Sequence, residues 1–316
     1  MENLIFSLNA TLPLFMLMIV GYVLRRINII DETFATKING FVFKIAIPAL
    51  LWGDLGTVDI KEAWNLKFVL FCFFATFLSI AIVYFLSYII KRRELRGEFI
   101  QASYRSSASM LGLAFIQNIY GTTGLGPLMI VASVPLYNVC AVAVLSFFSP
   151  SIDRDSASGN RMKNTLIGIV KNPIIIGILL GLLWSALKIP MPFIMKKTIS
   201  SIGATATPLG LISMGALFDY KKALNAGVPA LAGTFIKLVG FGAIFLPVAI
   251  YLGFTNQELI AILVMLCSAT TVSCFVMAKN MGHEGSLTST IVMLSTFLSA
   301  FTLTGWLFIL RSLAVV

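Results

Sequence analysis

The sequence predicts an all-α polytopic membrane protein whose ten transmembrane helices form two inverted five-helix repeats. Three observations predict this class. The chain of 316 residues is 58% hydrophobic and 11% charged, whereas a soluble domain carries about 25% charged residues. Its apolar residues form long runs, with basic residues gathered in the gaps between them. Its two halves share a spacing of prolines and glycines. This composition excludes a soluble globular enzyme and a disordered chain.

Ten apolar runs come close to the roughly 20 residues that a membrane helix needs. The runs in the first half are 10–24, 38–55, 66–90, 99–119 and 124–148. Those in the second half are 166–187, 198–218, 226–252, 259–278 and 287–310. We therefore expect a first repeat over residues 1–148, a cytoplasmic linker over 149–164, and a second, inverted repeat over 165–316.

The basic residues predict the orientation in the membrane. With the N-terminus outside, fourteen Lys and Arg residues fall in cytoplasmic gaps and six on the outer side. Three more, Lys44, Arg105 and Lys237, fall inside spans. The positive-inside rule then predicts a multi-pass protein of the cell (inner) membrane with both termini outside. The net charge of +10 is thus explained by the lipid bilayer, without a nucleic-acid partner.

A shift along the chain indicates the repeat. The matches at a shift of 160 or 161 residues are Pro13 with Pro173, Gly21 with Gly181, Pro48 with Pro208, and Ser107 with Ser268. Because each half has five spans, an odd number, the second half is inverted relative to the first. Inverted repeats are typical of secondary transporters, with the substrate site near the midplane where the halves meet. An accidental match of common membrane residues is the alternative.

Two hydroxyl-rich stretches occupy equivalent places in the fourth and ninth spans, residues 103–109 and 267–274. Small polar residues that weaken a helix in both halves indicate a pair of broken helices, whose free ends bind ions. The alternative is that these residues only allow close helix packing. We expect the substrate-binding hydroxyls to be Ser107, Ser109, Ser268, Thr270 and Ser273.

Charged residues narrow the substrate class. Arg105 lies beside the first hydroxyl-rich stretch, where it either binds the substrate or extends to the membrane surface. Lys44 and Lys237 are lone cations in otherwise apolar spans; either could form a structural bond to a carbonyl, and we expect neither to be a ligand. All thirteen acidic residues fall in gaps or at span ends. A membrane centre without carboxylates favours a small organic anion and transport that a pH gradient does not drive.

Cofactor, metal and enzyme sites are not expected. His283 is the single histidine of the sequence, so there is no second imidazole for a metal site. The four cysteines are widely spaced within apolar runs. No cofactor motif is present. An intramembrane enzyme would need a serine–histidine pair, paired membrane aspartates or an HExxH helix, and the sequence has none of these.

Several segments resemble the auxin efflux carrier family, whose bacterial members are often described as malate or malonate permeases and whose plant members export auxin. They are residues 172–173 (NP), 207–210 (TPLG), 214–215 (MG) and 275–282 (FVMAKNMG). The resemblance covers nearly the whole chain. It implies a fold like that of sodium/proton antiporters and bile-acid transporters. In it, helices 1, 2, 6 and 7 form a scaffold, and helices 3–5 and 8–10 form a transport domain with crossed, broken helices 4 and 9.

The resemblance also implies an elevator-type carrier that is not an enzyme and that pairs as a homodimer through its scaffold helices. The positions where helices are expected to break or kink are Pro48, Gly112, Ala114, Pro208 and Ala269. Ala114 and Ala269 stand where the family has prolines, and Ser107 stands where it has an asparagine. Two alternatives stay open: a sodium-coupled organic-anion symporter of the bile-acid-transporter type, and a non-transporting receptor derived from a carrier.

Overall fold

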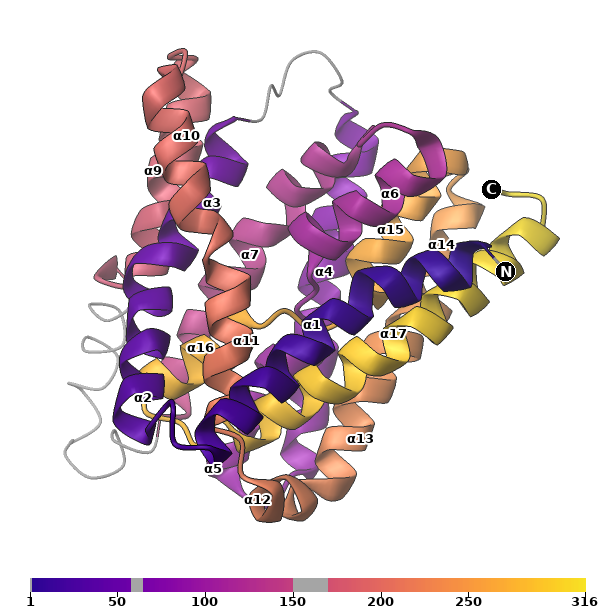
Figure 1. Cartoon of the computed structure of the whole chain (residues 1–316). Helices are drawn as coiled ribbons and strands as arrows, with labels where there is room; N and C mark the ends of the chain where they lie inside the picture. Colours follow the sequence, from indigo (N-terminus) through magenta and orange to yellow (C-terminus); the bar gives the residue numbers. More distant parts are fainter. Residues whose placement is uncertain (1, 58–64, 150–169) are drawn as a thin grey trace, which may run out of the picture.

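A computed structural model describes residues 2–57, 65–149 and 170–316, and all of their regular structure is helical (Figure 1). The α-helices of the first half are α1 Glu2–Arg26, α2 Glu32–Phe41, α3 Ile47–Gly56, α4 Leu66–Leu86, α5 Arg93–Tyr104, α6 Leu113–Tyr120 and α7 Gly126–Phe147. Those of the second half are α9 Pro173–Leu187, α10 Phe193–Ala204, α11 Ala206–Ala216, α12 Tyr220–Asn225, α13 Gly227–Phe235, α14 Phe241–Tyr251, α15 Asn256–Cys267, α16 Ser273–Asn280 and α17 Ser286–Ser312. Most of the predicted linker, from residue 150 on, lies outside the described residues.

Asparagine and aspartate side chains define where several helices begin. Asp31 accepts a hydrogen bond from Phe34 N (2.7 Å) at the start of α2. Asn65 does the same for α4, and Asn172 for α9, where Pro173 is the first helical residue. Such residues satisfy backbone N–H groups that have no partner in the first turn of a helix. The helices therefore begin at these polar residues.

Six helical stretches of the described residues are long and apolar enough to cross a membrane. They are Glu32–Gly56, Leu66–Ile89, Gly126–Phe147, Phe193–Ala216, Gly227–Tyr251 and Ser286–Ser312. The first joins α2 to α3 through a π-helical turn, Val42–Ala46. α9 and α15 are shorter apolar helices. The chain is thus a helical membrane protein. The total of ten transmembrane spans remains a prediction.

Glycines bring two helix pairs into backbone contact. A Cβ atom added at Gly21 of α1 would lie 2.1 Å from Ile212 O of α11, and one at Gly215 of α11 would lie 2.0 Å from Met18 O of α1. In the pair α3–α9, a Cβ at Gly177 would lie 2.6 Å from Pro48 O. Only glycine permits these approaches, so any side chain at the three positions would force the helices apart.

The helices form one group of close packing around α3 and a second around α7, which packs on α4 and α5. α3 packs on α9 and α10, and α2 on α11 (Figure 1, left). α1 runs across the front of the view, packed on both α11 and α17. Phe15 of α1 contacts Phe297 of α17, while Arg25 and the start of α17 line one cavity. α1 and α17 are therefore antiparallel, and the start of α1 and the end of α17 lie at the same end of the molecule.

Candidate functional site

The predicted fourth and ninth spans are both interrupted, and their interruptions meet. α5 ends at Tyr104, and the extended Arg105 (φ −75°, ψ 135°) leads to a π-helical turn, Ala108–Gly112, and then to α6. α15 ends at Cys267, and the extended Ser268 leads toward α16. Ser107 N donates to Ala269 O at 2.9 Å, which joins the two interruptions directly.

The expected kink positions fall differently within these elements. Ala269 lies in the second interruption, and Pro48 lies in the first turn of α3, just after the π-helical turn. Pro208 lies in the first turn of α11, after the break between α10 and α11 at Thr205. Gly112 closes the π-helical turn that follows the first interruption. Ala114, however, lies inside α6; the helix breaks earlier, where residues 105–107 are held by contacts to other helices.

Each break leaves backbone carbonyls without a partner in their own helix, and side chains from other segments donate hydrogen bonds to these carbonyls. Ser106 Oγ and Tyr137 OH both donate to Met265 O, the latter at 3.0 Å. Lys237 donates to Leu266 O and to Ser106 Oγ. In a membrane such carbonyls need partners within the protein. This is why the helices break without prolines at Ala114 and Ala269.

Lys237 forms a structural bond to a carbonyl, as the sequence allowed, and it is completely buried. Its ammonium lies at the C-terminal end of α15, where the helix dipole is negative. Lys44, by contrast, is exposed on the helix surface. Two buried cations, Lys237 and Arg105, therefore lie where the two interruptions meet. We call this region the crossing.

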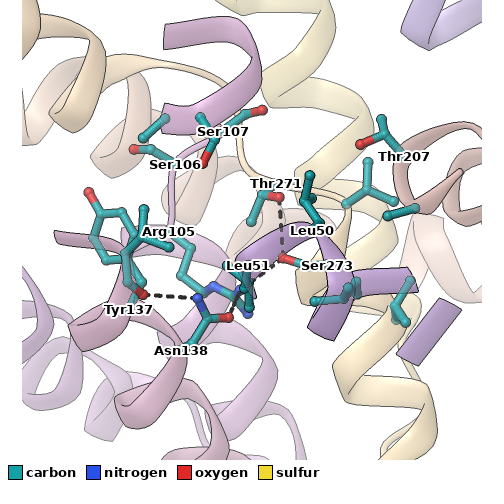
Figure 2. Close-up of a pocket in the computed structure, with 17 residues that line it drawn as sticks. Leu50, Leu51, Arg105, Ser106, Ser107, Tyr137, Asn138, Thr207, Thr271 and Ser273 are labelled. Carbon is teal, nitrogen blue, oxygen red and sulfur yellow. Dashed lines mark hydrogen bonds between the residues drawn. The ribbon is translucent and has the colours of Figure 1, made fainter. Parts of the chain in front are cut away.

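A cavity of about 70 Å³ lies between α3, α7, α11 and the two interruptions (Figure 2). This is room for a few water molecules or one carboxylate group. Its polar lining comes from Arg105, Ser106, Ser107, Ser109, Tyr137, Asn138, Thr207, Thr271 and Ser273. Apolar side chains of α3, such as Leu50 and Leu51, close the opposite wall. The cavity thus combines one cation and several hydroxyls in an apolar enclosure.

Arg105 is the central polar group of this cavity, and it is only 2% exposed. Its Nη2 donates to Asn138 Oδ1 at 2.7 Å and to Ser273 Oγ at 2.8 Å, and the three side chains point toward one another in Figure 2. Its Nη1 donates to Met277 Sδ at 2.8 Å and, more weakly, to Gln101 Oε1 at 3.4 Å. Nε has no partner.

Every partner of Arg105 is electrically neutral. No carboxylate of the described residues lies within 4.0 Å of its guanidinium, and no acidic residue lines the cavity. Burial of a cation without a counter-charge is costly in a membrane protein and is typical of a functional group. The arrangement suits an anionic ligand.

The structure separates the six predicted ligands into two sets. Arg105, Ser107, Ser109 and Ser273 line the cavity, whereas Ser268 and Thr270 do not. Thr270 Oγ1 donates to Ala102 O at 2.8 Å, and Thr270 N donates to Ser295 Oγ at 3.0 Å. Ser268 Oγ is buried without a partner. Ser268 and Thr270 lie on the side of the extended segment after α15 that is turned away from the cavity.

Four further residues line the cavity that are not among those predicted from the sequence: Tyr137, Asn138, Thr207 and Thr271. Asn138 carried a usable signal, because it is an amide inside the apolar run 124–148. Its side chain is 3% exposed and is held by a bond from Nδ2 to Val134 O at 2.9 Å. Thr271 lies in the second hydroxyl-rich stretch and Thr207 in the segment 207–210, but nothing in the sequence marked either side chain itself as a lining group.

Two carboxylates that the sequence places at span ends are buried inside the protein. Glu98 is 1% exposed and accepts hydrogen bonds from Gly285 N, Thr288 N and Thr288 Oγ1 at 2.9–3.0 Å. It therefore caps the N-terminus of α17, where a negative charge is favourable. Asp54, near the end of α3, lies close to the Ser109 side chain. Its Oδ2 atom is buried without a partner, so an acidic group does adjoin one predicted ligand.

Comparisons with known proteins agree with this architecture. A Rhizobium meliloti protein named "Putative malonate transporter" is 23% identical over 95% of each chain. An uncharacterized transporter of Methanothermobacter thermautotrophicus is 22% identical over 95% of this chain and 97% of its own. The sodium proton antiporter MjNhaP1 from Methanocaldococcus jannaschii has a similar fold, with a TM-score of 0.62 at 14% identity over 95% of this chain and 97% of its own.

The antiporter-like fold that the sequence motifs implied is therefore confirmed at the level of fold. The family model described as membrane transport protein matches residues 6–307, nearly the whole chain. The chain belongs to this membrane transport protein family, the auxin efflux carrier family.

Proposed function

We propose that the protein is a secondary carrier that moves a small organic anion, a mono- or dicarboxylate, across the cell membrane. The observation that carries this proposal is Arg105: a buried guanidinium with only neutral partners and an unpartnered Nε, lining a cavity at the crossing of two broken helices. A guanidinium binds a carboxylate through two parallel, charge-assisted hydrogen bonds. The similarity to the protein named for malonate supports a carboxylate substrate.

The cavity residues would replace the hydration of the substrate. Moving a carboxylate through a membrane without donors is prohibitive. Ser107, Ser109 and Ser273 supply hydroxyl donors beside Arg105. α16 begins at Ser273, beside Arg105, and the positive end of its helix dipole would also favour an anion there. This set fits one carboxylate group, and the rest of the substrate would extend along the apolar wall of α3.

The packing supports an elevator-type movement. The helices α2, α3, α9, α10 and α11 pack on one another, and α5, α7, α15 and α16 carry the crossing and most of the cavity. The cavity lies between these groups, so a sliding movement of one past the other would carry a bound anion across the membrane. Homodimerisation through the first group, and both termini on the outer face, belong to the same proposal.

An anion fits the crossing better than sodium does. Two buried cations, Arg105 and Lys237, lie within it, and side chains already donate to Met265 O and Leu266 O. A sodium ion would be repelled by both cations and would lack these carbonyls as ligands. This charge distribution favours the anion carrier over a sodium symporter that uses the crossing.

Flux into proteoliposomes tests the proposal. Purified protein is reconstituted, and uptake of labelled malonate and of a panel of other mono- and dicarboxylates is measured with and without a sodium gradient. We expect saturable uptake of at least one carboxylate without sodium, and loss of that uptake in Arg105→Gln. Saturable binding without flux would instead indicate a receptor, and flux that requires sodium would indicate a symporter.

A further inference from the structure

A polar cavity and an apolar groove adjoin at the end of α1 that carries Arg25 and Arg26. The polar cavity has a volume of about 620 Å³ and lies between α1, α12 and the start of α17. The groove has a volume of about 310 Å³ and lies between α1, α11 and α17. Tyr22 and Phe218 line both. The two therefore form one continuous amphipathic depression, separate from the cavity at Arg105.

The polar part carries an excess of positive charge. Its lining includes five basic residues (Arg25, Arg26, Lys221, Lys222, Lys279) and three acidic ones (Glu32, Asp219, Glu284), a net charge of 5 − 3 = +2. Two basic groups are paired: Arg25 with Glu32 at 3.4 Å and Lys222 with Glu284 at 2.5 Å. Within the described residues, Arg26, Lys221 and Lys279 have no acidic partner within 4.0 Å.

One of these free cations is oriented by an aromatic residue that belongs to both parts. Arg26 Nε and Nη2 donate to Tyr22 OH at 3.0 and 2.8 Å, and the guanidinium carbon lies 5.1 Å from the centre of the Tyr22 ring. The exposed side chain of Arg26 is thereby held at the point where the polar cavity meets the groove.

The groove is lined almost entirely by hydrocarbon and thioether groups: Phe15, Met18, Ile19, Met214, Phe218 and Met293. Phe15 lies ten residues before Arg25 on α1, which corresponds to about 15 Å along a helix axis. This is about half of the roughly 30 Å hydrocarbon thickness of a bilayer. The groove thus runs from the level of the basic cluster to about the depth at which one leaflet ends.

From this geometry we infer a binding site for an anionic phospholipid. Its phosphate lies among Arg26, Lys221 and Lys279, and one acyl chain lies in the groove along α1. A soluble phosphate would use only the basic cluster and would leave the adjoining hydrocarbon groove without a function. Basic pockets between membrane helices are typical sites for acidic headgroups. The inference does not depend on the substrate proposed above.

The site has a mechanical consequence. α1 and α11 pack together closely, while α17 begins at the Glu98 cap, beside the broken helix α5. A lipid in the groove contacts α1 and α11 on one side and Met293 of α17 on the other. If α17 slides relative to α1 during transport, the lipid sits at that sliding contact and regulates the movement.

Purified full-length protein in neutral detergent tests the site by thermal unfolding and native mass spectrometry. The probes are phosphatidylglycerol, phosphatidylcholine with the same acyl chains, and glycerol 3-phosphate. We expect phosphatidylglycerol alone to raise the unfolding midpoint and to remain bound in the gas phase, because ligand binding to the folded state stabilises it. The double variant Arg26→Gln/Lys221→Gln should weaken this binding roughly five- to thirtyfold, since each basic residue contributes about fivefold near the membrane surface.

Two further variants complete the design. Lys37→Gln/Lys91→Gln removes two exposed charges from the same predicted face outside the cavity and should bind phosphatidylglycerol like the parent. Ile19→Trp fills the groove, leaves the basic cluster intact, and should weaken binding as well. Each variant must first match the lipid-free unfolding midpoint of the parent.

Several results would overturn the inference. Equal stabilisation by phosphatidylcholine would mean that lipids only solvate the surface. Equal stabilisation by glycerol 3-phosphate would identify a site for soluble phosphates. A mass corresponding to a second chain in place of lipid would make the groove a dimer contact. Unchanged phosphatidylglycerol binding in both the double variant and Ile19→Trp would place the lipid elsewhere.

Discussion

Arg105 Nη2 donates to Asn138 Oδ1 at 2.7 Å, and the orientation of that amide is fixed by its own bond to Val134 O. A neutral acceptor satisfies the guanidinium without neutralising its charge. α7 thus holds the guanidinium in place with its charge intact, as the proposed anion site requires. A carboxylate at position 138 would occupy the same space and cancel the charge.

Asn138→Asp is therefore expected to weaken anion binding while leaving the fold intact. The new carboxylate would pair with Arg105, and we expect affinity for any transported carboxylate to fall at least about tenfold, the scale of a lost charge-assisted hydrogen bond. Binding by calorimetry and flux in proteoliposomes measure this. Asn138→Ser, which stays neutral, should lose less. Parent-like affinity in Asn138→Asp would show that Arg105 is not the anion ligand.

Substitutions of Arg105 itself should rank by charge and shape. Arg105→Gln removes the charge and should weaken binding about ten- to a hundredfold. Arg105→Lys keeps the charge but not the planar fork and should lie between Gln and the parent. Lys44→Gln, at an exposed cation on a neighbouring helix, serves as the control and should bind normally. The same loss in Arg105→Lys and Arg105→Gln would mean that the fork, and not the charge, decides binding.

Hydroxyls on the two sides of the second interruption should behave differently. Ser273 bonds to Arg105 and lines the cavity, so Ser273→Ala, like Ser107→Ala, should lower affinity. Thr270 bonds to the Ala102 carbonyl, so Thr270→Val should lower the free energy of unfolding by about 1–3 kcal/mol, because a buried acceptor loses its partner. Its affinity, measured below the unfolding transition, should equal that of the parent. A reversed pattern would move the substrate to the Ser268–Thr270 side.

Substitution of Asp54 tests whether transport is coupled to a proton gradient. Its carboxylate adjoins Ser109, and a negative charge there opposes a bound anion, so Asp54→Asn should raise anion affinity by about two- to tenfold. With the charge of the substrate held constant, an imposed pH gradient should change the initial rate of the parent little. Strong acceleration by that gradient in the parent, absent from Asp54→Asn, would instead identify Asp54 as a proton carrier.

The Lys222–Glu284 pair gives a stability that depends on pH and salt. Its hydrogen bond to Lys222 lowers the pKa of Glu284 below its usual value. A lowered folded-state pKa contributes stability above the unfolded pKa, near 4.3, and loses it as the pH falls through the folded value. Glu284→Gln should therefore lower the unfolding midpoint slightly at pH 7, and this effect should disappear as the pH falls through the folded-state pKa of Glu284. The difference at pH 7 should shrink in 1 M salt, and its persistence there would exclude an ion pair as the cause.

Local sequence was enough to predict the helical membrane class, the two spans that are interrupted, and the cation beside the first interruption. Long apolar runs and short basic gaps are read directly along the chain, because a membrane helix depends only on the hydropathy of its own residues. The two hydroxyl-rich stretches marked both interruptions for the same reason, since each weakens its own helix.

Which side chains share a site depends on how the helices pack, and this became visible in the folded chain. Asn138 and Ser273 are 33 and 168 residues away from Arg105, yet they bind the same guanidinium atom. Thr270 and Ser273 lie three residues apart and face different surroundings. Glu98, which the sequence places at a span end, is buried as a cap on a helix almost 190 residues away. Each residue turns a helix by about 100°, so the rotation and depth at which helices pack decide which groups meet, and neither quantity is written in the local sequence.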